Sequence, residues 1–310
     1  MNWIKPPALK TGDTIGIVAP ASSIKPELFE QGCRELESLG FRTYFRPDIL
    51  SSFRFFAGPD QRRREEFLEM LRNPEIKAIF CARGGYGSGH LIPDLTPEVL
   101  RDNPKIICGA SDITVVLGAM QRAGVVGFHG PMVATSIRQG AGGYDRTLLR
   151  DVLQHGNAVR FPLQGTKILN PGVAEGRLTG GCLSLVAAAI GTAAEADTAD
   201  SIFVLEDIDA KPYQIDRMIT QLIQAGKFDA VRAVVFGEML RCFQHSDQGY
   251  MLEDVLGDLL RPLGIPILFG FPTGHTSRPN LIVPFGVRAR LDLNDAPVFE
   301  LLEPAVTSNS

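Results

Sequence analysis

Residues 77–129 decide the fold and read KAIFCARGGYGSGHLIPDLTPEVLRDNPKIICGASDITVVLGAMQRAGVVGFH. This stretch contains three short apolar runs, each typical of a buried strand. The runs cover residues 77–81, 105–108 and 125–128. Between them, residues 93–101 and 111–122 are expected to form helices. Strands that alternate with helices in this way predict a parallel sheet with helices on both faces.

The alternation extends towards the N-terminus. Thr14–Val18 and Phe41–Phe45 are expected strands, and Pro26–Leu39 is an expected helix. A further helix is expected at Asp60–Leu71, with its apolar residues on one face. The run Arg62–Arg64 lies on the other face of that helix, so we expect it to be solvated rather than to bind phosphate.

The pattern changes after about residue 155. Turns become frequent and residues 159–178 alternate in the manner of antiparallel strands. Further strands are expected at residues 201–205, 230–236 and 265–269, and further helices at 184–190, 213–225 and 252–260. We therefore expect an N-terminal α/β domain at 1–155, a linker at 156–172 and a C-terminal β-rich α/β domain at 173–310.

The composition is that of an ordinary globular protein. Of the 310 residues, 45% are hydrophobic and 21% are charged, and the net charge of −4 argues against a nucleic-acid partner. Five scattered cysteines without a C-x-x-C pair favour reduced thiols over disulfides. No apolar core of a signal peptide follows Met1, and the longest apolar stretch is too short to span a membrane. We therefore expect a cytoplasmic location and no membrane partner.

The glycine loop, residues 84–89 with the sequence GGYGSG, follows the expected strand at 77–81. Its backbone N–H groups can approach a ligand closely, because glycine has no Cβ. Dinucleotide binding is one interpretation, with Asp112 as the acid after the next strand, but the G-x-G-x-x-G spacing is missing. A tight packing turn is a second interpretation. We favour a third, in which the N–H groups stabilise a developing anion.

Ser111 follows the strand at 105–108 and stands where a helix begins. A serine at this place commonly caps the helix. The same turn can instead expose a nucleophilic hydroxyl, with the next backbone N–H facing the oxyanion. The G-x-S-x-G motif is only half matched, because Gly109 fits but Ile113 occupies the last glycine position. The motif alone favours the cap and leaves the nucleophile open.

A nucleophilic serine needs a base, and the base needs a carboxylate that orients it. Glu206, Asp207 and Asp209 follow the strand at 201–205, at the edge where α/β sheets bind their ligands. The ordinary role of these acids would be to cap the helix that begins near Pro212. Asp209 is nearer to that helix and suits the cap better than Glu206 does.

The chain has five histidines, which limits the candidates for a general base. His275 and His129 each follow an expected strand, in a loop that contains Gly and Pro, and such loops commonly carry catalytic groups. His90 belongs to the glycine loop, and His155 and His245 lie in turn or polar segments. Spacing ranks His275 ahead of His129 but does not decide between them.

Seven segments, in order along nearly the whole chain, together resemble the LD-carboxypeptidases, a family of serine peptidases that includes the microcin C immunity proteins. The segments are GDTIGIVAPAS (Gly12–Ser22), ARGGYGS (Ala82–Ser88), GASDIT (Gly109–Thr114), FHGPM (Phe128–Met132), LTGGCLSL (Leu178–Leu185), LEDIDAKPYQIDRM (Leu205–Met218) and GFPTGHTSRPNLIVPFG (Gly270–Gly286). Each segment is moderately specific, and their order makes the resemblance strong.

The resemblance implies a catalytic triad of Ser111 as nucleophile, Glu206 as orienting carboxylate and His275 as general base. It also implies that the backbone N–H groups of Gly85 and Asp112 form the oxyanion hole. The family fold places the site between an N-terminal α/β domain and a C-terminal β-rich domain, and members look like homodimers. One departure is Cys182, where the family commonly has Asn, so the contacts near the site are in doubt there.

The resemblance further implies a serine carboxypeptidase that needs no metal or other cofactor. Its substrate would be a small peptide, the cytoplasmic murein tetrapeptide, cleaved at the L,D-amide bond to the terminal D-alanine during peptidoglycan recycling. One alternative is a hydrolase that detoxifies peptide–nucleotide antibiotics of the microcin C type. Another is a protein that binds a nucleotide or sugar in the α/β cleft without chemistry.

Overall fold

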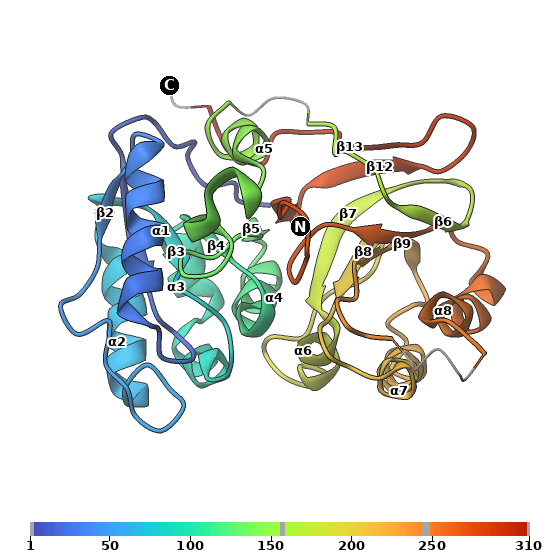
Figure 1. Ribbon diagram of the computed structural model, residues 1–310, viewed down its shortest axis with the longest axis horizontal. Coiled ribbons are helices and arrows are strands. Elements are labelled where there is room, and N and C mark those ends of the chain that lie inside the picture. The colour runs from blue at the N-terminus through green and yellow to red at the C-terminus, as the bar shows by residue number, and fades with distance from the viewer. Residues whose placement is uncertain (1–2, 156–158, 244–248, 309–310) are drawn as a thin grey trace.

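The computed structural model describes residues 3–155, 159–243 and 249–308. Figure 1 shows two sheets side by side, the first built mainly from the N-terminal half of the chain and the second from the C-terminal half. The protein is of the mixed α/β class, and parallel pairing dominates the first sheet, as the sequence predicts. Within the described ranges, no helix is long and apolar enough to cross a membrane.

The first sheet has the strand order β11-β5-β4-β3-β1-β2. Its parallel strands are β1 (Thr14–Val18), β2 (Arg42–Tyr44), β3 (Ile76–Cys81), β4 (Ile106–Gly109) and β5 (Gly127–His129). All five agree within about two residues with strands that the sequence predicts. Because β3 and β4 are parallel neighbours, the glycine loop after β3 and Ser111 after β4 leave the sheet at the same edge.

The helices of this half are α1 (Pro26–Ser38), α2 (Asp60–Arg72), α3 (Pro97–Asp102), α4 (Thr114–Arg122) and α5 (Arg146–Arg150). Four further helical segments, which are not regular α-helices, are η1 (Ser88–Asp94), η2 (Ser111–Ile113), η3 (Ile137–Gly142) and η4 (Asp151–His155). The single helix expected at 93–101 is therefore two elements, η1 and α3. The Thr96 side chain accepts a hydrogen bond from Val99 N and caps α3, so this helix begins at Pro97.

The expectation that Arg62–Arg64 are solvated is wrong for Arg62 and Arg63, which are buried. The Arg63 guanidinium donates hydrogen bonds to the carbonyl oxygens of Pro20, at 2.6 Å, and Gly87, at 2.7 Å. These carbonyls lie in the loops after β1 and β3, where no neighbouring strand supplies a donor. A guanidinium has five donors in a fixed plane and can serve both loops at once.

The second sheet has the order β13-β12-β7-β8-β9-β10-β6. Its strands are β6 (Lys167–Asn170), β7 (Val173–Cys182), β8 (Ser201–Glu206), β9 (Val231–Gly237), β10 (Ile267–Phe271), β12 (Arg288–Asp292) and β13 (Val298–Leu301). The central strands β7 to β10 are parallel, whereas β6, β12 and β13 pair antiparallel at the two edges. The helices are α6 (Leu183–Ala188), α7 (Pro212–Gln224) and α8 (Leu252–Leu260), with a short turn η6 (Arg261–Leu263).

Strand β8 is buried on both faces, which explains its uninterrupted apolar sequence. Phe203 and Leu205 point into a cluster formed with α6, α7 and α8. Ile202 and Val204 point the opposite way, into a larger cluster that also contains side chains of the first sheet. The two sheets therefore share one continuous core.

Strand β6 lies inside the range 156–172 that the sequence assigns to a linker, and it pairs with β10 at the edge of the second sheet. Antiparallel pairing of this short strand with β10 covers that edge. The rest of the expected linker includes residues 156–158, which lie outside the described residues.

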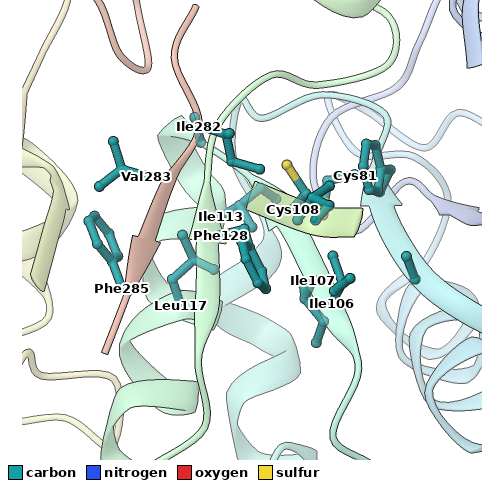
Figure 2. Close-up of a cluster of buried hydrophobic side chains, with 14 of the residues drawn as sticks. Cys81, Ile106, Ile107, Cys108, Ile113, Leu117, Phe128, Ile282, Val283 and Phe285 are labelled. Atoms are coloured by element: carbon teal, nitrogen blue, oxygen red, sulfur yellow. The ribbon is translucent and has the colours of Figure 1, made fainter. Parts of the chain in front are cut away.

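Strand β11 (Val283–Phe285) returns to the first sheet and pairs antiparallel with β5, although it lies far inside the expected C-terminal domain. Figure 2 shows Val283 and Phe285 in one buried cluster with Phe128 of β5 and Leu117 of α4. Full burial of such side chains stabilises the fold by about 1.5–3 kcal/mol each. The same cluster contains Ile107 and Cys108 of β4 and Ile113, which is two residues after Ser111.

Candidate active site

Ser111 occupies a sharp turn between β4 and α4. Its φ of 60° lies in the left-handed region, which costs a residue with a Cβ about 1–3 kcal/mol. The helix α4 begins only at Thr114, and the residue before it, Ile113, makes no side-chain cap. Ser111 is therefore not the cap of α4, and its strained turn has the geometry that exposes a nucleophile in a G-x-S-x-G motif.

Ile113 explains why the last glycine of that motif is not needed. A Cβ added at Gly109 would lie 2.9 Å from two carbon atoms of the Ile113 side chain. The glycine at 109 thus makes room for the isoleucine, which is fully buried in the core below the turn. Packing between these two residues keeps the turn in place without a second glycine.

The glycine loop lies directly on the serine turn. A Cβ at Gly84 would lie 3.0 Å from Ser111 Oγ and 3.2 Å from the backbone N of Asp112. Gly85 has a φ of 106°, and its N–H has no hydrogen-bond acceptor among the described residues. Gly84 therefore packs against Ser111 and the N–H of Asp112, and the N–H of Gly85 follows directly in the chain, which is compatible with a pair of oxyanion donors.

Asp112 ties the loop to the turn through its own side chain. Its carboxylate accepts hydrogen bonds from Ser88 N at 2.8 Å and from Ser88 Oγ at 2.5 Å. Burial raises the pKa of Asp112, more than these hydrogen bonds lower it. The carboxylate is thus engaged in holding the loop, through its Oδ2 atom.

Glu206 and His275 form a close pair at the ends of β8 and β10. His275 Nδ1 lies 2.7 Å from Glu206 Oε2, and His275 N donates to the same oxygen at 2.9 Å. A carboxylate only accepts, so Nδ1 carries the proton and Nε2 has its lone pair free. The carboxylate therefore fixes the tautomer that a general base needs.

Burial and charge act in opposite directions on this pair. Burial lowers the pKa of His275, but the charge and hydrogen bond of Glu206 outweigh this effect, so the pKa is raised above its ordinary value. Burial raises the pKa of Glu206, but His275 and more weakly His129 outweigh it, so this pKa is lowered. Each partner thus favours the charged form of the other.

Two side chains, those of Glu238 and Asn280, hold the loop of His275. The Glu238 carboxylate accepts from Thr276 Oγ1, Ser277 N and Arg278 Nε at 2.6–2.8 Å. Burial alone would raise the pKa of Glu238, but these bonds lower it to about 2. On the other side, Asn280 Nδ2 donates to the carbonyl oxygen of Gly274 at 2.8 Å. The histidine loop is therefore braced both before and after His275.

Thr114, the first residue of α4, connects the turn of Ser111 to the second sheet next to Glu206. Thr114 Oγ1 accepts a hydrogen bond from Cys182 N at 2.9 Å, and Cys182 is the register partner of Glu206 in the second sheet. The structure thus brings Ser111 and the Glu206–His275 pair to one region from opposite sheets. Ser111 Oγ makes no hydrogen bond to His275 in the part of the chain that the structure describes, and catalytic bonds of this kind often tighten only with substrate.

His129 also approaches Glu206, from the first sheet. Its Nε2 lies 3.9 Å from Glu206 Oε1, and its ring stacks on Phe285 with 5.4 Å between centroids. Burial is complete and lowers the pKa of His129 to about 4, so the ring is neutral. The side chain of His275, by contrast, is 22% exposed and bonded to the carboxylate. The geometry favours His275 as the base.

The remaining histidines lie away from this region or outside the described residues. His90 pairs with Asp60 at 3.0 Å, His155 pairs with Asp151 at 3.0 Å, and His245 is outside the described residues. The cap role considered for Asp209 is wrong, because the residue before α7 is Lys211. The Asp209 carboxylate pairs with Arg241 instead.

Comparisons with known proteins agree with this architecture. Family profiles described as the LD-carboxypeptidase N-terminal domain and the LD-carboxypeptidase C-terminal domain match residues 15–130 and 175–291. The probable murein peptide carboxypeptidase of Bacillus subtilis (strain 168) is 36% identical over 315 residues, which is 99% of this chain and 96% of that protein. The chain belongs to the LD-carboxypeptidase family.

Two other relatives of the LD-carboxypeptidase family differ in their described activities. The crystal structure of a muramoyltetrapeptide carboxypeptidase from Oxalobacter formigenes has a TM-score of 0.83 and 27% identity, and covers 96% of this chain and 100% of that one. The microcin C7 self-immunity protein of Escherichia coli is 29% identical over 93% of this chain and 92% of that protein. The family membership inferred from the seven segments is confirmed, and the roles of individual residues stay predictions.

Reasoning from the sequence missed several residues that shape this site in the LD-carboxypeptidase fold. Glu238 follows β9 in the way that Glu206 follows β8, so the rule that α/β sheets bind ligands at the ends of their strands could have found it. Arg63 and Ser88 gave no comparable signal. Their partners are backbone groups and a carboxylate that only the folded chain brings near.

A cavity of about 770 Å³ opens beside the serine turn. Asp112 and Tyr86 line it together with apolar residues of α4 and α6. This volume is in the usual range for a small-molecule site. One group of side chains in the described residues could also hold a metal ion, namely Cys182, Glu206 and His275.

Proposed function

We propose that this LD-carboxypeptidase homologue is a serine hydrolase with Ser111 as nucleophile, His275 as general base and Glu206 as the carboxylate that orients the base. The observation that carries the proposal is the 2.7 Å contact between His275 Nδ1 and Glu206 Oε2 at the edge facing the strained Ser111 turn. A serine, a base with a fixed tautomer and two backbone donors are the parts that acyl transfer requires.

In the acylation step, Ser111 Oγ attacks the carbonyl carbon of the scissile amide while its proton moves to His275 Nε2. The N–H groups of Gly85 and Asp112 stabilise the oxyanion, and losing one such donor costs roughly 2.7–4 kcal/mol. The C–N bond then breaks as His275 returns the proton to the leaving nitrogen. A water molecule adds to the acyl-enzyme with His275 as base, which releases the acid and restores Ser111. These steps need no metal or other cofactor.

The substrate that we propose is a murein tetrapeptide, cleaved at the L,D-amide bond before its terminal D-alanine. Support comes from relatives described as carboxypeptidases of murein peptides and muramoyltetrapeptides. The cavity that Tyr86 and Asp112 line has the volume for part of a short peptide, and Asp112 is the residue after Ser111, although Ser111 itself does not line it. This activity would serve peptidoglycan recycling in the cytoplasm by a protein that acts as a homodimer, which cell fractionation and light scattering can test.

The deciding experiment is incubation with a murein tetrapeptide and measurement of released D-alanine. We expect release by the wild-type protein and a loss of about 10³-fold or more in Ser111→Ala. Ser38→Ala, a change on the exposed end of α1, is the matched control and should release D-alanine normally. Normal turnover by a folded Ser111→Ala protein would overturn the proposed nucleophile.

A second candidate is hydrolysis of a peptide–nucleotide antibiotic of the microcin C type. Its support is the 29% identity with the microcin C7 self-immunity protein over 93% of this chain. The same triad would cleave an amide or acyl linkage in either substrate. Mass spectrometry of the products from both substrates, at equal enzyme concentration, distinguishes the two functions. Faster turnover of the antibiotic would make it the primary substrate.

A further inference from the structure

Three different metal-binding side chains converge at the C-terminal edge of the second sheet. Cys182 ends β7, Glu206 ends β8 and His275 follows β10. One ligand atom of each lies within 4.8 Å of the other two. Parallel pairing of Cys182 with Glu206 and the bond from Glu206 to His275 bring the three together, so the cluster is a consequence of the fold.

The carboxylate of the cluster has neither Lys nor Arg as an ion-pair partner. Among the described residues, only His275 and His129 bring basic side-chain nitrogen atoms within 4.0 Å of the Glu206 carboxylate. Glu206 Oε1 is buried and has no hydrogen-bond partner among the described residues. A buried carboxylate oxygen without a donor is costly, by more than the 1–3 kcal/mol of a neutral group. A bound cation would supply the missing partner.

His129 adds a nitrogen on the far side of the carboxylate. Its Nε2 lies 3.9 Å from Oε1, and neither of its ring nitrogens has a hydrogen-bond partner among the described residues. His129 is not one of the three side chains whose ligand atoms lie within 4.8 Å of one another, so it faces the cluster across Glu206 and is not counted as a ligand.

We propose that Cys182, Glu206 and His275 form a binding site for a thiol-seeking divalent cation, Zn²⁺ in the first place, and that occupancy of this site inhibits the enzyme. Zinc accepts sulfur, nitrogen and carboxylate ligands at about 2.0–2.3 Å, so its ligand atoms lie roughly 3.5 Å apart. Binding therefore requires the side chains to rotate from their present separation of up to 4.8 Å to this distance. A thiolate ligand excludes Mg²⁺ and Ca²⁺, which prefer oxygen.

Binding and inhibition follow from one set of bonds. Zn²⁺ bonds to Cys182 Sγ, whose proton leaves to solvent, and to the His275 imidazole and the Glu206 carboxylate, with no change of oxidation state. The metal occupies an imidazole lone pair and competes with the Glu206–His275 hydrogen bond, so His275 can no longer take the Ser111 proton. The inhibition rests on the proposed serine mechanism, whereas metal binding does not.

Cys182 supplies the sulfur among the three ligands. An amide is a poor zinc ligand beside a thiolate. The backbone N–H of residue 182 bonds to Thr114 whatever the side chain is. Cys182→Asn is therefore a compact change that removes the sulfur and retains the local backbone contact.

Metal binding is tested in the Ser111→Ala protein, whose altered residue is not a proposed ligand. Titration with Co²⁺, followed by the thiolate-to-metal charge-transfer absorption, should show one site per chain. Calorimetry with Zn²⁺ should give the same stoichiometry. Cys182→Asn in this background should weaken Zn²⁺ binding by at least ~100-fold, since loss of a mere outer-shell partner already costs 10–100-fold. Cys33→Ser on α1 also removes a buried thiol and should change neither measurement.

Inhibition is tested in the active protein by the release of D-alanine at increasing Zn²⁺. We expect inhibition that a chelator reverses, and an inhibitory concentration at least ~100-fold higher in Cys182→Asn. A Co²⁺ complex without thiolate absorption, or equal Zn²⁺ affinity in Cys182→Asn and its parent, would overturn the site. The Co²⁺ spectrum of Ser111→Ala needs no altered ligand and no activity. It therefore separates failure of the metal site from failure of the proposed hydrolase.

Discussion

Glu206 is approached by a histidine from each of the two sheets. One of its oxygens accepts two hydrogen bonds from His275, and the other faces His129 across 3.9 Å. Sequence spacing could not choose between these histidines, because each follows a strand that ends at the site. The structure gives the reason, since both rings approach the same carboxylate from different sheets. Only hydrogen bonding and exposure separate them.

The two histidines should differ strongly when each is replaced. We expect His275→Ala to lower kcat by about 10⁴-fold, because the base and its bond to Glu206 are lost together. His129→Phe keeps a flat ring on Phe285, and the His129 ring has no hydrogen bond among the described residues that the change would break, so we expect less than a tenfold change in kcat. Steady-state kinetics with a murein tetrapeptide measures both. A greater loss in His129→Phe than in His275→Ala, with both proteins folded, would make His129 the base.

The pH dependence of the reaction should report His275. The base must be neutral to accept the serine proton, so kcat/KM falls as the pH falls through the pKa of His275 in the free enzyme. Glu206 raises this pKa above the ordinary value of about 6.5. The acid limb should therefore lie above about pH 6.5, and Glu206→Gln should move it to lower pH as well as reduce kcat.

A pH–rate profile of wild type and Glu206→Gln over the same buffers checks this prediction. The prediction depends on the direction in which the acid limb moves. Removal of the carboxylate leaves burial as the main effect on the pKa of His275, and burial lowers that pKa. An acid limb that stays in place in Glu206→Gln would assign the titration to another group.

At the scale of elements, the glycine loop is shaped by how closely it approaches the serine turn. A Cβ at Gly84 would lie 2.8 Å from Ser111 Cβ, whereas a Cβ at Gly89 would meet no described atom within 4 Å. We expect Gly84→Ala to push the loop off the turn and reduce kcat by about 10²-fold or more, the cost of one misplaced oxyanion donor. Gly89→Ala is the matched change in the same segment and should be tolerated. Equal kinetics of the two variants would contradict this close approach.

Arg63 of helix α2 also holds the glycine loop, through its hydrogen bond to the carbonyl oxygen of Gly87. Replacing Arg63 with Met leaves the buried carbonyl of Pro20 without this donor, at about 1–3 kcal/mol, whereas the carbonyl of Gly87 loses one of two donors and keeps its bond from His90 N. We therefore expect Arg63→Met to lower the free energy of unfolding by that order, measured by urea denaturation, and to lower kcat as well. Arg64→Met on the exposed part of the same helix is the control. An unchanged free energy of unfolding in Arg63→Met would show that the glycine loop keeps its conformation without Arg63.

The elements also show where prediction from sequence succeeds and where it stops. Strands and helices of regular length follow from their apolar periodicity, as β1, β3 and α2 illustrate. The burial of Arg63 could not be predicted, because a polar face of a helix looks the same whether it meets water or the carbonyls of a loop. Strand β11 has three residues, too few for any pattern to assign it to a sheet.

The candidate site divides in the same way. Gly109 and Ser111 lie in a local motif that indicates a turn, and Glu206 and His275 each follow a strand, so their neighbourhood at the sheet edge could be predicted. Their pairing is tertiary and came only from the resemblance to a family. The contacts of Glu238 and Ser88 depend on loop conformations that no local pattern specifies.

At the scale of the whole molecule, the two sheets are joined by more than the site. Ile202 and Val204 of β8 lie in the same cluster as Ile107 of β4 and Phe285 of β11. Strand β11 belongs to the first sheet, while β10 before it and β12 after it belong to the second. Separating the sheets would therefore expose a shared core and break the pairing of β11 with β5. We expect the two halves to unfold together.

Two fluorescent reporters test this cooperativity. Trp3 is the single tryptophan of the chain, and it packs against the shared core with Arg177 of β7 5.6 Å above its ring. A second reporter is Phe228→Trp in a Trp3→Phe background, placed in the separate cluster behind the second sheet.

Within each protein, urea transitions followed by tryptophan fluorescence and by far-UV circular dichroism should coincide. Comparison within each protein cancels the destabilisation of about 1–3 kcal/mol that a larger core side chain brings. The contradicting outcome is a fluorescence transition of the Phe228→Trp reporter at lower urea than the loss of circular dichroism. It would mean that the layer of α6, α7 and α8 unfolds by itself. The shared core would then couple only the inner face of the second sheet to the first sheet.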